Sequence, residues 1–198
     1  MTGNATIEND CTGAGLAKAQ DAAVELYQVA ALMLGSEADA LTLVEETFSG
    51  IEIDPCEQEE VASALIRRQL VDAVMAKMHQ SDPQAFLAPP ASDAVSATCI
   101  EDDDLSAAGL TQAELAELIN GTGRDEMRAW LEKLPLAQRA IFVQRAVLGW
   151  DNGTTAETLK RDSGSGWQPQ QVSEVFRQAL CSLANALVHS AAANRVTA

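Results

Sequence analysis

The residue types that usually perform catalysis or bind metals are few in this chain. The cysteines and histidines are Cys11, Cys56, Cys99, Cys181, His79 and His189. They show no CxxC spacing and no clustering, so neither a structural zinc site nor a disulfide framework is expected, and buried thiols in a reducing cytosol are the default interpretation. Convergent acid, base or nucleophile groups and a phosphate-binding glycine loop are also missing. We therefore expect no enzyme activity, no cofactor, no metal and no small-molecule substrate.

Charge is distributed unevenly along the sequence. The formal net charge is −16, with −10 in residues 1–80, −9 in 81–126 and +3 in 127–198. Because DNA phosphates attract Lys and Arg and repel carboxylates, only the last third is suited to approach DNA. Its basic residues fit either DNA contact or helical ion pairs on a solvated surface, and they include Arg128, Lys133, Arg139, Arg145, Lys160, Arg161 and Arg177.

Composition and periodicity predict an all-α protein. Hydrophobic residues make up 47% of the chain and aromatics only 4%, and the prevalent Ala and Leu lose little entropy in a helix. Apolar residues at helical spacing predict helices over 21–35, 36–50 and 62–79, with Gly35 ending the first one. Residues 15–80 are thus expected to form an N-terminal helical bundle.

A second small domain is predicted over 111–190. Thr111 and Glu114 have the spacing of a capping box, and further helices are expected over 124–134, 136–148, from Thr154, and from Pro169 onward. A short helix followed by a last long one has the outline of a helix-turn-helix. Tryptophan in such domains mostly lies in the core, which we expect for Trp130, while Trp150 and Trp167 fit either core or stacking positions.

Residues 81–110 are interpreted as an acidic, flexible linker between the two domains. They contain Pro83, Pro89 and Pro90, scattered Ser and Asp, and the run 101–104 of four acidic residues. This run lacks the alternating ligands and turn glycine of a calcium loop, so a solvated linker is expected. No basic segment precedes an apolar core at the start, and no long apolar stretch occurs, so we expect a cytoplasmic protein without membrane contact.

Residues 25–35 and 39–48 together resemble the start of the conserved second region of small sigma factors of the extracytoplasmic-function class. The family pattern for the second stretch is DAEDLVQETF, and the chain agrees with it at Asp39, Ala40, Leu43, Val44, Glu46, Thr47 and Phe48. In that family this helix pair docks on the clamp helices of RNA polymerase. The resemblance therefore implies polymerase-binding residues, which are Asp39, Leu43, Glu46, Thr47 and Phe48.

Residues 131–142 resemble the beginning of the fourth region of the same family, whose pattern is LxxLPxxQRxVF. Leu148, Gly149 and Glu157 continue the similarity into the helix-turn-helix. The resemblance implies groove reading by the last helix, since Gln can pair with adenine and Arg with guanine. The candidate DNA-binding residues are Arg161, Gln170, Gln171, Ser173 and Arg177.

The chain also departs from the family where the family contacts DNA. The interval between Phe48 and Phe86 contains no aromatic residue, whereas the family captures unpaired promoter bases there with aromatic and basic side chains. Ser173 and Val175 stand where Lys and Arg are usual. Two functions follow: a sigma-factor-like regulator of transcription initiation that binds core RNA polymerase and promoter DNA, or a sigma-fold interaction module that has lost DNA binding and acts as an anti-sigma-factor decoy or polymerase-bound regulator.

Overall fold

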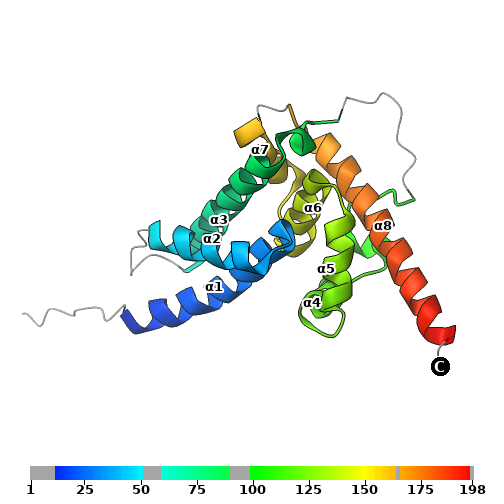
Figure 1. Ribbon diagram of the computed structural model, residues 1–198, viewed down its shortest axis with the longest axis horizontal. Helices are drawn as coiled ribbons and strands as arrows, with labels where there is room; N and C mark the ends of the chain where they lie inside the picture. Colours follow the sequence, from blue (N-terminus) through cyan, green and yellow to red (C-terminus); the bar gives the residue numbers. More distant parts are fainter. Residues whose placement is uncertain (1–11, 51–58, 90–98, 164–165, 197–198) are drawn as a thin grey trace, which may run out of the picture.

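The computed structural model describes residues 12–50, 59–89, 99–163 and 166–196, with 12–22, 59, 161–163 and 190–196 described as backbone only. Within these ranges the chain forms eight α-helices and no strand, so the all-α prediction is confirmed. Figure 1 shows the first three helices on one side of the molecule and the long last helix on the other. None of the helices in the described ranges is long and apolar enough to cross a membrane.

Three helices, α1 (Thr12–Leu34), α2 (Glu37–Gly50) and α3 (Glu59–Ser81), form the N-terminal bundle. As predicted, Gly35 ends α1, where it adopts a left-handed φ of 72° and its N–H donates to the carbonyl of Ala31. The Oγ of Ser36 then accepts from the backbone N–H of Asp39, which caps α2. This tight turn sets α2 against both α1 and α3.

Two short 3₁₀ helices follow: η1 (Pro83–Phe86) and η2 (Leu105–Ala108). Asp82 caps η1 by accepting from the N–H groups of Gln84 and Ala85, and the ring of Phe86 is completely buried. The described parts of the segment interpreted as a flexible linker therefore pack against the helices. Residues 90–98 lie outside the described part of the chain.

The remaining helices are α4 (Gln112–Asn120), α5 (Arg124–Lys133), α6 (Leu136–Phe142), α7 (Asn152–Ser163) and α8 (Pro169–Val196). The predicted capping box is confirmed, because the side chain of Thr111 accepts from the N–H of Glu114 and the Glu114 carboxylate accepts from the N–H of Thr111. The π-helical turn η3 (Val143–Val147) continues α6. Pro135 separates α5 from α6, as the sequence indicated.

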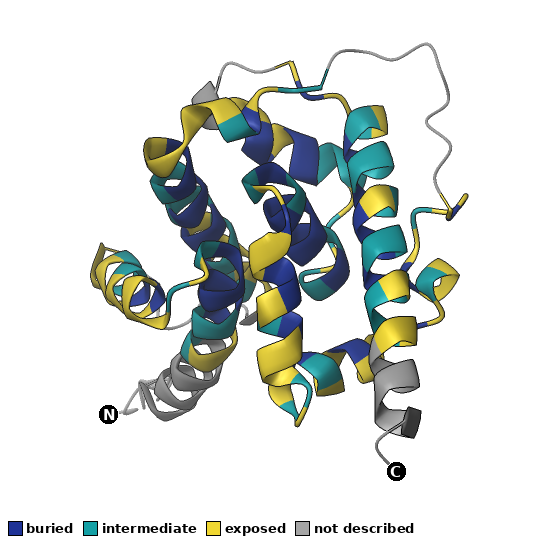
Figure 2. Ribbon diagram, turned by 45° about the vertical axis from the view of Figure 1, so that its right-hand side comes forward, coloured by how far each residue is buried: buried dark blue, intermediate teal, exposed yellow. Residues whose placement is uncertain are grey.

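One connected hydrophobic core runs through all of these elements (Figure 2). Trp167 is buried, and its Nε1–H donates to the carbonyl oxygen of Phe86 over 2.8 Å. Trp130 is buried too, as expected, and donates to the Oγ of Ser182. Helix α3 also packs on α7. The two groups of helices, α1–α3 with η1 and α4–α8 with η2 and η3, therefore contact each other.

The cysteines provide one correction to the sequence analysis. Cys99 and Cys181 form a disulfide, with their Cα atoms 5.8 Å apart. The expectation of free thiols is therefore wrong for this pair. Its members lie 82 residues apart in sequence, so no local spacing could reveal a contact that only the packing of residues 99–110 on α8 creates.

Candidate functional site

The predicted polymerase-binding residues all lie on α2, but their side chains differ in accessibility. Glu46 is exposed, whereas Leu43 and Phe48 are half-buried and pack against the core. The hydroxyl of Thr47 donates to the carbonyl of Leu43, one turn earlier in the helix. Leu43 and Phe48 face the bundle and hold α2 in place. The side of the helix that faces solvent includes Leu41, Thr42, Glu45 and Glu46, and we call it the outer surface of α2.

Asp39 is also exposed, and its side chain contacts α3. Its carboxylate accepts a hydrogen bond from the ammonium of Lys77 over 2.6 Å. The hydrogen bond from Lys77 is the main reason why the pKa of Asp39 lies below its ordinary value, with smaller contributions from Ser36 and from the charge of Lys77. Asp39 therefore ties α2 to α3 in the isolated chain.

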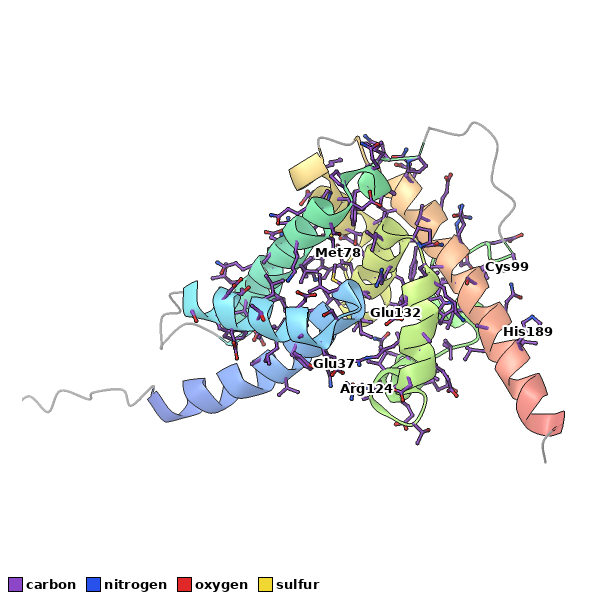
Figure 3. The ribbon with its side chains drawn as sticks, viewed as in Figure 1. Glu37, Met78, Cys99, Arg124, Glu132 and His189 are labelled. Carbon is purple, nitrogen blue, oxygen red and sulfur yellow. A yellow bond between two sulfur atoms is a disulfide. The ribbon has the colours of Figure 1, made fainter. Side chains whose placement is uncertain are left out.

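At the start of α2, Glu37 connects the N-terminal bundle to α5. Its carboxylate accepts from the guanidinium groups of Arg124, over 2.8 Å, and of Arg128. The pKa of Glu37 lies below its ordinary value, mainly because Arg128 donates a hydrogen bond and carries a positive charge. Arg124 contributes less to this lowering. Figure 3 shows Glu37 and Arg124 approaching each other from the two groups of helices. Arg128 thus belongs to an ion pair between α5 and α2 rather than to a pair within one helix.

Arg139, from the QR of the family motif, is buried rather than presented to DNA. It lies beneath the turn between α1 and α2, where its Nη1 would be only 2.8 Å from a Cβ placed on Gly35. Burial lowers the pKa of its guanidinium, and the nearby Glu132 carboxylate opposes that effect. This basic residue therefore has a structural position between the two groups of helices.

Four of the five predicted DNA-binding residues lie in the first turns of α8, whereas Arg161 belongs to α7. An open groove of about 360 Å³ is bordered by Asn152, Pro169, Gln170, Ser173, Glu174 and Arg177. Gln170 is exposed, but Gln171 donates to the carbonyl of Pro89 over 2.7 Å, and Arg177 donates to the carbonyl of Glu101 over 3.1 Å. The side chain of Arg161 lies outside the described part of the chain. Three of the five predicted residues are thus brought together at this groove.

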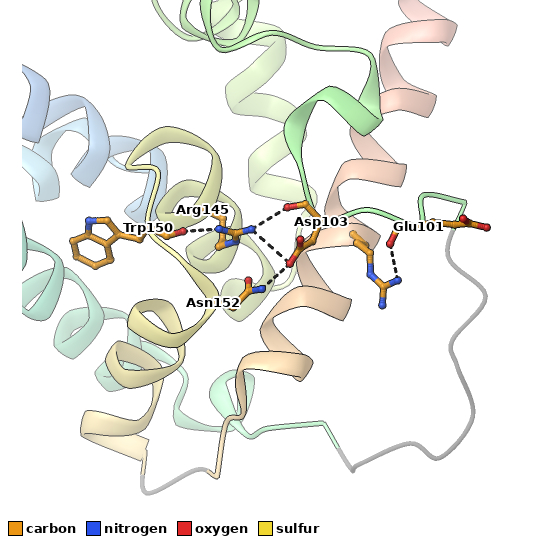
Figure 4. Close-up of polar contacts among 6 residues, drawn as sticks. Glu101, Asp103, Arg145, Trp150 and Asn152 are labelled. Carbon is orange, nitrogen blue, oxygen red and sulfur yellow. Dashed lines mark hydrogen bonds and ion pairs between the residues drawn. The ribbon is translucent and has the colours of Figure 1, made fainter.

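Asp103 forms the centre of a polar cluster beside that groove (Figure 4). Its carboxylate accepts from Asn152 over 2.6 Å and lies 3.6 Å from the guanidinium of Arg145. The hydrogen bond from Asn152 is the largest cause that lowers the pKa of Asp103, and a hydrogen bond from Ser173 and the charge of Arg145 act in the same direction against burial. The interpretation of the acidic run as solvated is therefore wrong for Asp103.

Arg145 organises the other side of the same cluster. It donates to the carbonyl of Trp150 over 2.7 Å and to the carbonyl of Asp103 over 2.9 Å. Its guanidinium also lies 5.0 Å from the ring centre of Phe176 on α8. Arg145 consequently joins η3, the loop before α7, residues 101–104 and α8, and its side chain is mostly buried.

Sequence reasoning missed this cluster and the neighbouring disulfide. Asp103 and Arg145 are 42 residues apart, so their pairing has no helical period to reveal it. A local signal existed only for Asp104, whose carboxylate accepts from the N–H of Ser106 and caps η2. Within the described ranges, no group of three or more His, Cys, Asp and Glu residues is arranged to hold a metal ion.

No family model, no curated protein and no solved structure matches the chain. The sigma-factor resemblance therefore depends on the two sequence motifs alone.

Proposed function

We propose that the chain is a sigma-factor-like regulator of bacterial transcription initiation that binds core RNA polymerase through the outer surface of α2. The observation that carries the proposal is the arrangement of the first motif. Its apolar residues Leu43, Val44 and Phe48 fix α2 on the bundle, while Glu46 and the half-exposed Leu41 face solvent. A firmly packed helix with an accessible acidic and apolar surface suits docking on another protein. Such a regulator works in the cytoplasm, where polymerase is found.

The test is binding of the tagged full-length protein to purified core RNA polymerase at moderate salt. We expect association in the wild type and a loss of at least tenfold in affinity in E46K, because the substitution reverses a charge on the docking surface. E117K is the matched control, since Glu117 is an exposed carboxylate on α4 outside both motifs. Equal binding by E46K, or no association of the wild type, contradicts the proposal.

The second candidate is an interaction module without DNA binding, acting as a decoy for an anti-sigma factor or as a polymerase-bound regulator. The contacts of Gln171 and Arg177 with residues of the 81–110 segment favour it, because these side chains must leave those partners before they can read DNA. Binding to duplex DNA that weakens steeply with salt excludes this candidate, since the slope reports several phosphate contacts.

A further inference from the structure

Residues 99–104, which we call the strap, cross α8 and are fastened to it at several points. The disulfide joins Cys99 to Cys181 of α8, and the carbonyl of Glu101 accepts from Arg177 one turn earlier in the helix. Beyond these contacts, Asp103 engages Asn152 and Ser173. The side chain of Ile100 is buried, so the strap has an apolar anchor as well.

The strap lies along one edge of the surface of α8 that was predicted to contact DNA. Its partners Ser173 and Arg177 border the groove, and the strap adds the exposed carboxylates of Glu101, Asp102 and Asp104 beside them. These carboxylates repel phosphate. The carbonyl of Glu101 and the carboxylate of Asp103 also occupy Arg177 and Ser173, whose hydrogen-bonding groups a base edge would need. This consequence rests on the proposed DNA contact, whereas the attachment of the strap to α8 does not.

We propose that the Cys99–Cys181 disulfide is a redox-controlled lock that holds the strap on α8, and that a dithiol reductant opens it. Cys99 is exposed and Cys181 is half-buried, so an incoming thiolate reaches the sulfur of Cys99. Attack there forms a mixed disulfide with Cys99, and Cys181 leaves as a thiolate and takes up a proton. The second thiol of the reductant then attacks the reductant's other sulfur, which is bonded to Cys99. This step closes a disulfide within the reductant and releases Cys99 as a thiol. Two electrons and two protons pass from the dithiol to the disulfide.

The disulfide is well suited to control the strap because it closes a long loop of the chain. The two cysteines lie 82 residues apart, and a cross-link over such a loop removes many conformations from the open state. After reduction, the strap loses its covalent attachment to α8 and keeps non-covalent contacts such as the Asp103 cluster, the bond of Arg177 and the burial of Ile100. We expect strap opening to become about tenfold more frequent when the cross-link is lost.

The experiment compares hydrogen exchange of the full-length protein in its oxidised form, after reduction with dithiothreitol, and in the C99S variant. Peptide mapping after thiol alkylation verifies that Cys99 and Cys181 are free in the reduced sample. We expect exchange in residues 99–109, where the N–H groups of Ser106, Ala107 and Gly109 donate hydrogen bonds, to be about tenfold faster in the reduced wild type, and equally fast in C99S with or without dithiothreitol. Residues 112–119 in α4 serve as the internal control and keep their protection. C181S provides an independent second variant.

Unchanged exchange of residues 99–109 in a sample whose cysteines are shown to be free overturns the lock. A random-sequence DNA duplex at low salt then tests the proposed function separately, with anisotropy measured in both redox states. Tighter DNA binding after reduction supports both proposals. Faster exchange of the strap without DNA binding in either state keeps the lock and removes the DNA contact, so the two failures are distinguishable.

Discussion

Asp103 is the single carboxylate of the acidic run that binds across to another part of the fold. Asn152, Ser173 and Arg145 all approach its oxygens, whereas the adjacent Asp102 is exposed. We expect D103A to lower the free energy of unfolding by about 1–2 kcal/mol, because a hydrogen-bonded charge is lost and its partners remain half-buried. D102A is the matched control and changes stability by less than about 0.5 kcal/mol. Urea unfolding of the two variants measures this difference, and equal stabilities would show that the cluster contributes nothing.

The same carboxylate should make stability depend on pH in the acidic range. Its pKa in the folded protein lies below the ordinary value of 3.8, so the folded state favours the charged form. The stabilisation is therefore complete above 3.8 and is lost as pH falls through the lowered pKa. We expect the stability difference between wild type and D103A to be constant near pH 6 and to shrink toward pH 3. A difference that stays constant down to pH 3 would contradict the assignment.

At the scale of the elements, the turn between α1 and α2 is the position most sensitive to a small change. Gly35 has a left-handed φ of 72°, and a Cβ there would meet Arg139, whereas Gly109 has a φ of 74° in open space. We expect G109A to cost about 1 kcal/mol for the backbone conformation alone. G35A should cost more, about 2–3 kcal/mol, because the buried guanidinium must also move. Thermal unfolding compares them, and equal losses would mean that Arg139 adjusts freely.

The elements also show which features a sequence can reveal. Helix boundaries were predictable where they depend on neighbouring residues, as at Gly35, at Ser36 and in the capping box of Thr111 and Glu114. The 3₁₀ turns η1 and η2 were missed because Pro and acidic residues also typify linkers, and only the burial of Phe86 and Leu105 distinguishes the two cases.

Long-range contacts were beyond the same reasoning. Three of the predicted DNA-binding residues do gather at one groove, because helical spacing places them on one side of α8. Ser173 and Arg177 find their partners Asp103 and Glu101 in a distant part of the sequence, and no period in the local pattern encodes such a meeting. The motifs thus located the surfaces, and the packing decided which residues are accessible.

At the scale of the whole molecule, the two groups of helices share polar as well as apolar contacts. Gln144 of η3 accepts from Thr158 of α7 and donates to the sulfur of Met75 of α3. Glu37 and the bond from Trp167 to Phe86 join the same two groups at other places. Because each group buries part of the other, we expect them to unfold together rather than as independent domains.

A substitution far from α4–α8 tests this cooperativity. Val44 is buried on α2, which packs on α1 and α3, while all three tryptophans lie in residues 130–167. V44A should cost about 2 kcal/mol from lost burial and the cavity it leaves. We expect the urea midpoint measured by tryptophan fluorescence to fall as much as the midpoint measured by far-UV circular dichroism. V24A removes the same atoms from an exposed site on α1 and should shift neither. If only the dichroism midpoint moved, the helices of the N-terminal bundle would unfold on their own, and the contacts of Glu37 and Trp167 would be too weak to couple the two groups.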